Sequence, residues 1–92
     1  MFDAVTRVEL VIAQGEVDAV LRLEDCETLE DFEAELASRE VRVVDLRTQG
    51  RPRIALPLAL DALASRAVTC IVASESVAKA LARHLRPPVE LR

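Results

Sequence analysis

Aromatic residues are nearly absent from this 92-residue sequence, which contains two phenylalanines, Phe2 and Phe32, and no tryptophan or tyrosine. Proteins that bind single-stranded nucleic acid stack bases on aromatic side chains, so this mode of binding has no support here. The net charge of −4 also disfavours a polyanionic partner. We therefore expect no nucleic acid partner.

Residues that ligate metals or act as nucleophiles are also scarce. His84 is the only histidine, and the two cysteines, Cys26 and Cys70, are far apart, so no zinc-binding pattern is present. Cys70 lies in an apolar stretch, and the acidic neighbours of Cys26 should raise its thiol pKa rather than activate it. The sequence contains no catalytic motif, so we expect a protein that is not an enzyme and needs no metal or cofactor.

No hydrophobic run reaches the roughly 20 residues that cross a bilayer, so we expect no membrane insertion. The first residues, Met1-Phe2-Asp3, lack the basic start of a secretory signal. A cytoplasmic location is the expectation. Hydrophobic residues still make up 51% of the sequence, enough for an aliphatic core in a single domain spanning residues 1–92.

Alternating apolar residues predict two strands near the start, at residues 5–13 and 17–23. Gln14-Gly15-Glu16 lies between them and has the composition of a tight turn. The pattern therefore predicts an antiparallel hairpin.

Helices and strands alternate after this point. Helical spacing and a capping-box pattern at Thr28 and Asp31 predict a helix over 28–39. A strand at 41–47, a helix at 57–66 with Pro57 in its first turn, a central strand at 68–73, a helix capped by Ser74 and an edge strand at 89–91 follow. The order ββαβαβαβ predicts a single α/β domain with a mixed, mostly parallel sheet and helices packed on it.

Charge is unevenly divided along the chain. Residues 1–40 carry 12 acidic and 3 basic residues, whereas residues 41–92 carry 4 acidic and 9 basic residues. Folding can bring the halves together so that their fields partly cancel. Alternatively, the protein has an acidic and a basic face, which suit a charged partner or head-to-tail self-association.

The segment 47–53 is the best candidate site, since it follows a strand and precedes a helix, where anions and ligands bind in α/β proteins. It contains Arg47, Thr48, Arg51 and Arg53 but lacks the glycine spacing and lysine of a phosphate-binding loop. A solvated polar loop is the plain alternative to a site that binds an anion or an acidic partner. Asp45, just before it, is predicted to hold the loop in shape by pairing with Arg47, Arg51 and Arg53.

The helix at 57–66 is apolar on both faces. Leu58 and Ala62 fall on one face, and Leu56, Leu60 and Leu63 on another. A helix on a sheet buries one stripe, so the second face is either buried too or contacts a partner. We expect Leu56, Leu60 and Leu63 to join the 47–53 loop in binding a partner.

The element order and the segments VRVVDLR and CIVASESVAKAL resemble the STAS domain, the family of sulfate transporter domains and anti-sigma-factor antagonists. Antagonist members carry a phosphorylatable serine where the loop enters the second helix. The corresponding residues here are Arg53-Ile54-Ala55-Leu56, without a hydroxyl, so the resemblance implies a divergent member that is not phosphorylated at that position.

These observations predict a regulatory or scaffolding module that acts through protein–protein binding. The resemblance implies a kinase, a sigma-factor regulator or a transporter component as the partner. The alternative is a structural subunit that associates with itself into oligomers or filaments through head-to-tail charge complementarity.

Overall fold

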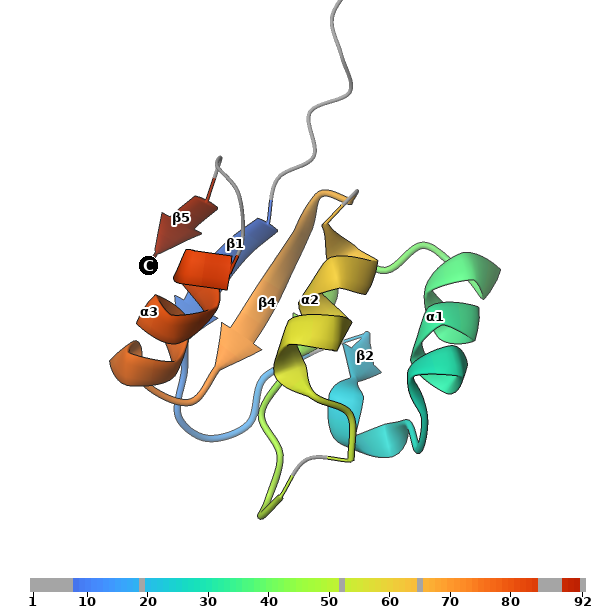
Figure 1. Cartoon of the computed structure of the whole chain (residues 1–92), viewed down its shortest axis with the longest axis horizontal. Helices are drawn as coiled ribbons and strands as arrows, with labels where there is room; N and C mark the ends of the chain where they lie inside the picture. The colour runs from blue at the N-terminus through green and yellow to red at the C-terminus, as the bar shows by residue number, and fades with distance from the viewer. Residues whose placement is uncertain (1–7, 19, 52, 65, 85–88, 92) are drawn as a thin grey trace, which may run out of the picture.

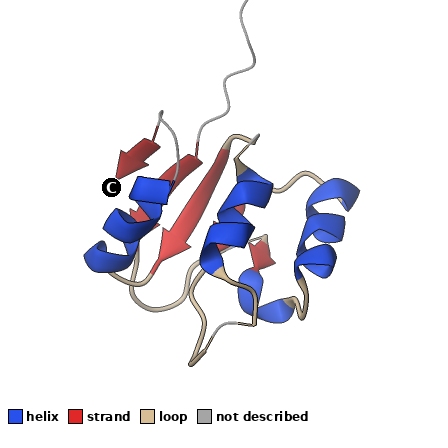
Figure 2. Ribbon diagram, in the orientation of Figure 1, coloured by secondary structure: helices blue, strands red, loops and turns tan. Residues whose placement is uncertain are grey.

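A five-stranded sheet carries three helices on one of its faces (Figures 1 and 2). The structure is a computed structural model that describes residues 8–18, 20–51, 53–64, 66–84 and 89–91. Its elements are β1 (Val8–Ile12), β2 (Leu21–Arg22), the 3₁₀ helix η1 (Leu23–Asp25), α1 (Leu29–Ser38), β3 (Val43–Asp45), α2 (Leu56–Leu63), β4 (Val68–Val72), α3 (Glu75–His84) and β5 (Val89–Leu91). The predicted α/β class and ββαβαβαβ order are confirmed.

The strand order explains why the helices share a face. The sheet runs β2-β3-β4-β1-β5, with β4 in the centre and β5 at an edge, as predicted. The connections through α1, α2 and α3 all step across the sheet in the same direction. Because parallel crossovers share one handedness, the three helices lie on the same face, as Figure 1 shows.

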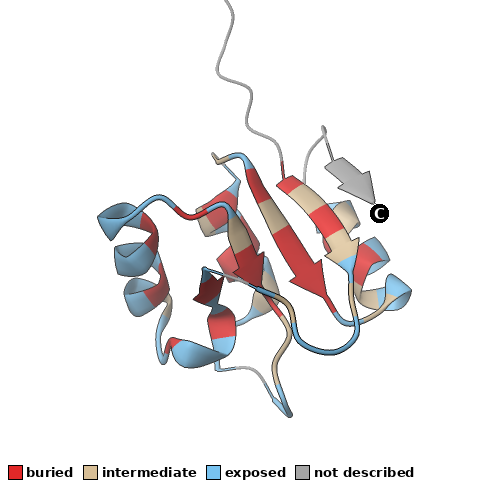
Figure 3. Ribbon diagram, turned by 180° about the vertical axis from the view of Figure 1, so that it is seen from behind, coloured by how far each residue is buried: buried red, intermediate tan, exposed pale blue. Residues whose placement is uncertain are grey.

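The predicted hairpin is wrong. Strands β1 and β2 are separated by β4 and β3, and every strand pair among the described residues is parallel. The connection from β1 to β2 steps in the direction opposite to the helical crossovers. The same handedness therefore takes it across the face without helices, which Figure 3 shows from behind.

The core lies between the sheet and the helices. Leu21, Val44, Cys70 and Leu10 stand in register across four strands, and each is at most 4% exposed. Side chains alternate between the faces of a strand, so Asp45 and its neighbour in register, Ile71, point to the opposite face.

Helix α1 begins and ends close to its predicted limits. The Thr28 hydroxyl accepts a hydrogen bond from the Asp31 amide at 3.0 Å, which confirms the N-terminal cap. Phe32 and Leu36 form its buried stripe, and acidic residues occupy the exposed positions. Helix α1 packs beside α2, at the edge of the sheet formed by β2.

Other predicted elements are shorter in the structure. Strand β3 has three residues instead of seven, and α2 ends at Leu63 instead of Arg66. Ser74 caps α3, as its hydroxyl accepts a hydrogen bond from the Val77 amide at 3.3 Å. The first residues of the strand predicted at 5–13 lie outside the described residues. The segment 85–88, where Pro87 and Pro88 are expected to end the helix that Ser74 caps, lies outside them as well. None of the helices described is long and apolar enough to cross a membrane.

Candidate functional site at the carboxyl end of the sheet

The loop from β3 to α2 leaves the sheet at the carboxyl end of β3, where α/β proteins commonly bind ligands. Gly50 has a φ of +82°, a conformation that L side chains rarely adopt, so a glycine is favoured at this bend. The Thr48 hydroxyl donates to the Gly50 carbonyl at 3.4 Å, which keeps Thr48 within the loop.

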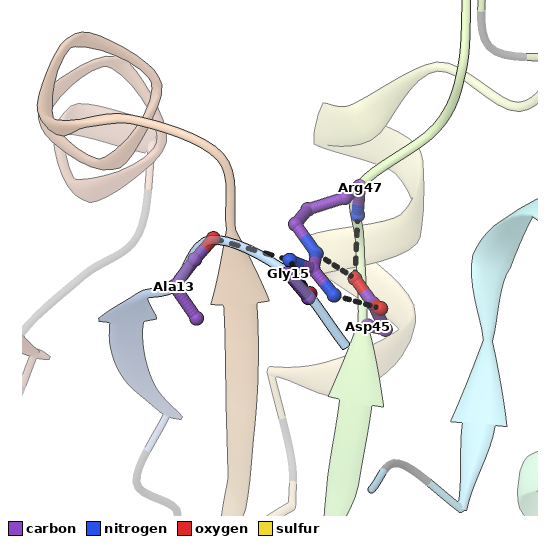
Figure 4. A network of polar contacts seen from close by, with 4 residues as sticks. All are labelled: Ala13, Gly15, Asp45 and Arg47. Carbon is purple, nitrogen blue, oxygen red and sulfur yellow. Dashed lines mark hydrogen bonds and ion pairs between the residues drawn. The ribbon is translucent and has the colours of Figure 1, made fainter. Parts of the chain in front are cut away.

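Asp45 and Arg47 form the base of this loop (Figure 4). The Asp45 carboxylate accepts hydrogen bonds from Arg47 Nε and Nη2, both at 2.9 Å, and from the Arg47 amide at 3.0 Å. The side chain of Asp45 is 6% exposed and that of Arg47 is 20% exposed. The two-pronged contact fits the planar guanidinium, and it satisfies a carboxylate that is otherwise out of water. The predicted role of Asp45 in shaping the loop is therefore supported through Arg47.

Arg47 also fastens the connection from β1 to β2. Its Nη1 atom donates to the Ala13 carbonyl at 3.1 Å and to the Gly15 carbonyl at 2.7 Å. These carbonyls are drawn together with Asp45 in Figure 4. Gly15 has a φ of +77°, so the turn that presents its carbonyl depends on glycine. The residues expected to make a hairpin turn thus bind Arg47 of the β3–α2 loop instead.

The pKa values of the pair agree with this geometry. Burial alone raises the pKa of the Asp45 carboxyl, but hydrogen bonds from Arg47 and its positive charge lower it by more, so the pKa lies below its ordinary value. The hydrogen bond to Asp45 also raises the pKa of Arg47. Both groups remain ionised at neutral pH, which makes this a structural ion pair rather than a proton-transfer site.

Arg51 and Arg53 differ from Arg47. Both are exposed, and neither has a hydrogen-bond or ion-pair partner among the residues that the structure describes. They line a depression of about 290 Å³ with Thr48 and Gln49 on one side and η1, including Glu24 and Asp25, on the other. The expectation that Asp45 pairs with Arg51 and Arg53 is therefore wrong.

Helix α2 turns a different face outward from the one predicted. Leu60 and Leu63 are 0% exposed and belong to the core under α2, so they are unavailable to a partner, and that part of the prediction is wrong. Leu56 is half-buried against the same core. Leu58 is 48% exposed, so α2 presents this large apolar side chain to solvent. Helical spacing places Leu58 and Leu60 on opposite faces of α2. The burial of Leu60 shows which of these faces packs on the core.

The cysteine thiols are poor nucleophiles. Burial raises the pKa of Cys70 to about 12. Burial also raises the pKa of Cys26, and the carboxylates of Glu35, Asp31 and Asp25 add to the effect. Both thiols therefore stay protonated at neutral pH, and the direction predicted for Cys26 is confirmed.

His84 links two helices. Its Nε2 atom lies 3.0 Å from Asp61 Oδ1, so the end of α3 contacts the outer face of α2. This contact was not predicted, because 23 residues separate the two positions in the sequence. His84 therefore contributes to a contact between α2 and α3.

Comparisons with known proteins identify no relative: the chain matches no family model, no curated protein and no solved structure. The resemblance to the STAS domain stays a prediction. The function therefore has to be argued from the geometry described above.

Proposed function

We propose that this protein is a non-enzymatic regulatory or scaffolding module that binds another protein through the 47–53 loop and the outer face of α2. The observation that carries the proposal is the set of side chains presented there. Arg51 and Arg53 have no partner within the described chain, and Leu58 follows in the first turn of α2 with 48% of its surface exposed. Arginine beside exposed apolar surface is a composition enriched at protein interfaces.

The base of the loop supports this proposal. Arg47 is held by five hydrogen bonds, to Asp45, Ala13 and Gly15, so the chain leaves the sheet in a fixed direction. Fixing one end of a binding loop before the partner arrives lowers the entropy lost on binding. The two free guanidinium groups favour a partner with carboxylates around a small apolar patch.

Capture from the native lysate with matched variants tests the proposal. We expect Arg51→Glu and Leu58→Ser each to reduce recovery of the partner several-fold, as measured by quantitative mass spectrometry. Arg42→Glu is the control for the charge change, because Arg42 precedes β3 at its amino end and, among the described residues, its side chain pairs with the exposed Glu40 alone. Recovery of the same partners in the same amounts by all three variants would place the binding surface elsewhere.

A further inference from the structure

The loop from β3 to α2 lies across from the 3₁₀ helix η1, and the two are separated by the depression of about 290 Å³. Strands β2 and β3 are neighbours in the sheet, and η1 follows directly after β2. Both segments therefore lie at the carboxyl end of the same strand pair, which is the lower end of the sheet in Figure 1. Open α/β sheets commonly bind ligands outside this end of their strands.

The two walls of the depression carry opposite charge. Arg51 and Arg53 lie on the loop side, and Glu24 and Asp25 lie on the side of η1. All four residues are exposed, and none of their side chains has a hydrogen-bond or ion-pair partner in the part of the chain that the structure describes. The opposite charges thus line one depression without pairing with each other, so each can pair with a ligand.

Both walls are held in place by the rest of the fold. On the side of η1, Leu23 and Cys26 are buried in the hydrophobic core, and the Cys26 amide donates to the Leu23 carbonyl at 3.0 Å. The loop is fixed at one end by the hydrogen bonds of Arg47 and at the other end by Ile54, which is buried in the same core. A ligand therefore meets walls that are already positioned, which lowers the entropy lost on binding.

The size and the polarity of the depression limit what it can hold. Pockets for cofactors and other small molecules commonly measure roughly 300–1,000 Å³ and are mostly apolar. This depression is at the lower limit of that range, and its apolar lining residues, Leu23 and Cys26, are almost completely buried. Thr48 and Gln49 complete the lining, so most of the surface offered to a ligand is polar. One or two charged side chains of another protein fit this description better than a cofactor does.

From these observations we infer that the depression binds a segment of the partner protein in which an acidic and a basic side chain are neighbours. The acidic side chain pairs with Arg51 and Arg53, and the basic side chain pairs with Glu24 and Asp25. A ligand with charge of one sign is attracted by one wall and repelled by the other, whereas a segment with both signs in the matching order is attracted by both. This inference rests on the proposed function and deepens it, because it names the chemistry that the 47–53 loop recognises.

Nuclear magnetic resonance titration of the purified protein with short blocked peptides tests the inference. The probes are acetyl-Gly-Lys-Glu-Gly-amide, acetyl-Gly-Glu-Lys-Gly-amide, and versions of each in which glutamine replaces either the lysine or the glutamate. At low salt we expect at least one doubly charged peptide to shift amide signals of both η1 and the loop, and to bind about two- to fivefold more tightly than its singly charged versions.

Three results would overturn the inference. One is that no peptide shifts the signals of both walls, and another is that doubly and singly charged peptides bind equally. The third concerns free glycine, a zwitterion without a peptide chain. If glycine binds as tightly as the better peptide, the depression takes a small zwitterion and not a segment of a protein.

Neutral substitutions on each wall locate the contacts. We expect Glu24→Gln and Arg51→Gln each to weaken binding of the doubly charged peptide about two- to fivefold. Glu27→Gln and Arg42→Gln make the same changes at exposed positions outside the lining, and should leave the affinity unchanged. Circular dichroism checks that each variant is folded. Equal effects of a variant and its matched control would show that the peptide binds outside the depression, and the inference would fail.

Capture from the native lysate distinguishes failure of this inference from failure of the proposed function. The inference expects Glu24→Lys to reduce recovery of the partner several-fold, whereas Glu27→Lys, its matched control outside the lining, should not. Equal recovery by these two variants would overturn the inference, because the partner would then contact the loop without entering the depression. The proposed function fails only if Arg51→Glu and Leu58→Ser also leave recovery unchanged.

Discussion

The segment 45–63 contains two sets of side chains of similar chemistry that the fold uses in opposite ways. Asp45, Arg47 and Leu60 are fixed inside by hydrogen bonds or by complete burial. Arg51 and Leu58, a few residues away, are exposed, and Arg51 has no intramolecular partner among the described residues. The inner set holds the loop and the helix in place, and this leaves the outer set free for contact with another molecule.

The two faces of α2 should show the largest difference between the sets. Leu60→Ala removes a side chain that is 0% exposed and should lower the free energy of unfolding by about 2–5 kcal/mol, since it leaves a cavity in the core. Leu58→Ala makes the same chemical change at a residue that is 48% exposed, and should change the free energy of unfolding by about 0.5 kcal/mol or less. Urea denaturation measures both, and similar losses would contradict the assigned orientation of α2.

The Asp45–Arg47 pair should produce the next largest effect. Asp45→Asn keeps the size of the side chain but removes its charge, and should cost about 1–3 kcal/mol because the Arg47 guanidinium loses charged hydrogen bonds. Arg47→Ala should cost a similar amount and also release the carbonyls of Ala13 and Gly15. The double variant should lose clearly less than the sum of the two, as denaturation will show. Additive losses would mean that the pair is not energetically coupled.

Stability should respond to pH through the same carboxylate. The pKa of Asp45 in the folded protein lies below its ordinary value of 3.8, so folding favours the ionised form. This contribution is complete above the unfolded pKa, and it is lost as the pH falls through the folded pKa. Between pH 7 and pH 3 the wild type should therefore lose more stability than Asp45→Asn. Identical pH profiles of the two proteins would show that Asp45 is not the responsible group.

The sequence predicts most elements of this fold but only part of their arrangement. Apolar periodicity and the cap at Thr28 locate α1, and the apolar run at residues 68–72 identifies β4 as the central strand, because both signals are local. The strand pairing of β1 is not local. Gln14-Gly15-Glu16 has the composition of a hairpin turn, yet Arg47, 32 residues beyond Gly15, binds the Gly15 carbonyl in a crossover between parallel strands.

The candidate site likewise has a part that the sequence predicts and a part that it does not. Asp45 and Arg47 are two residues apart, so their pairing was predictable from the sequence. Which face of α2 is buried was not, because Leu58 and Leu60 are chemically identical and both faces of the helix are apolar. The position of α2 between α1 and α3 on the sheet decides that Leu60 is buried.

The smallest effect on stability should come from a substitution of Arg51. This substitution tests most directly whether Arg51 belongs to the outer set. Arg51 is exposed and has no ion-pair partner among the described residues, so Arg51→Ala should change the free energy of unfolding by about 0.5 kcal/mol or less. Its effect should add to that of Asp45→Asn, in contrast to the coupling expected between Asp45 and Arg47. Denaturation of the single and double variants measures both quantities. A coupling between Asp45 and Arg51 as large as that between Asp45 and Arg47 would show that Arg51 belongs to the inner set, and it would remove Arg51 from the surface proposed to bind a partner.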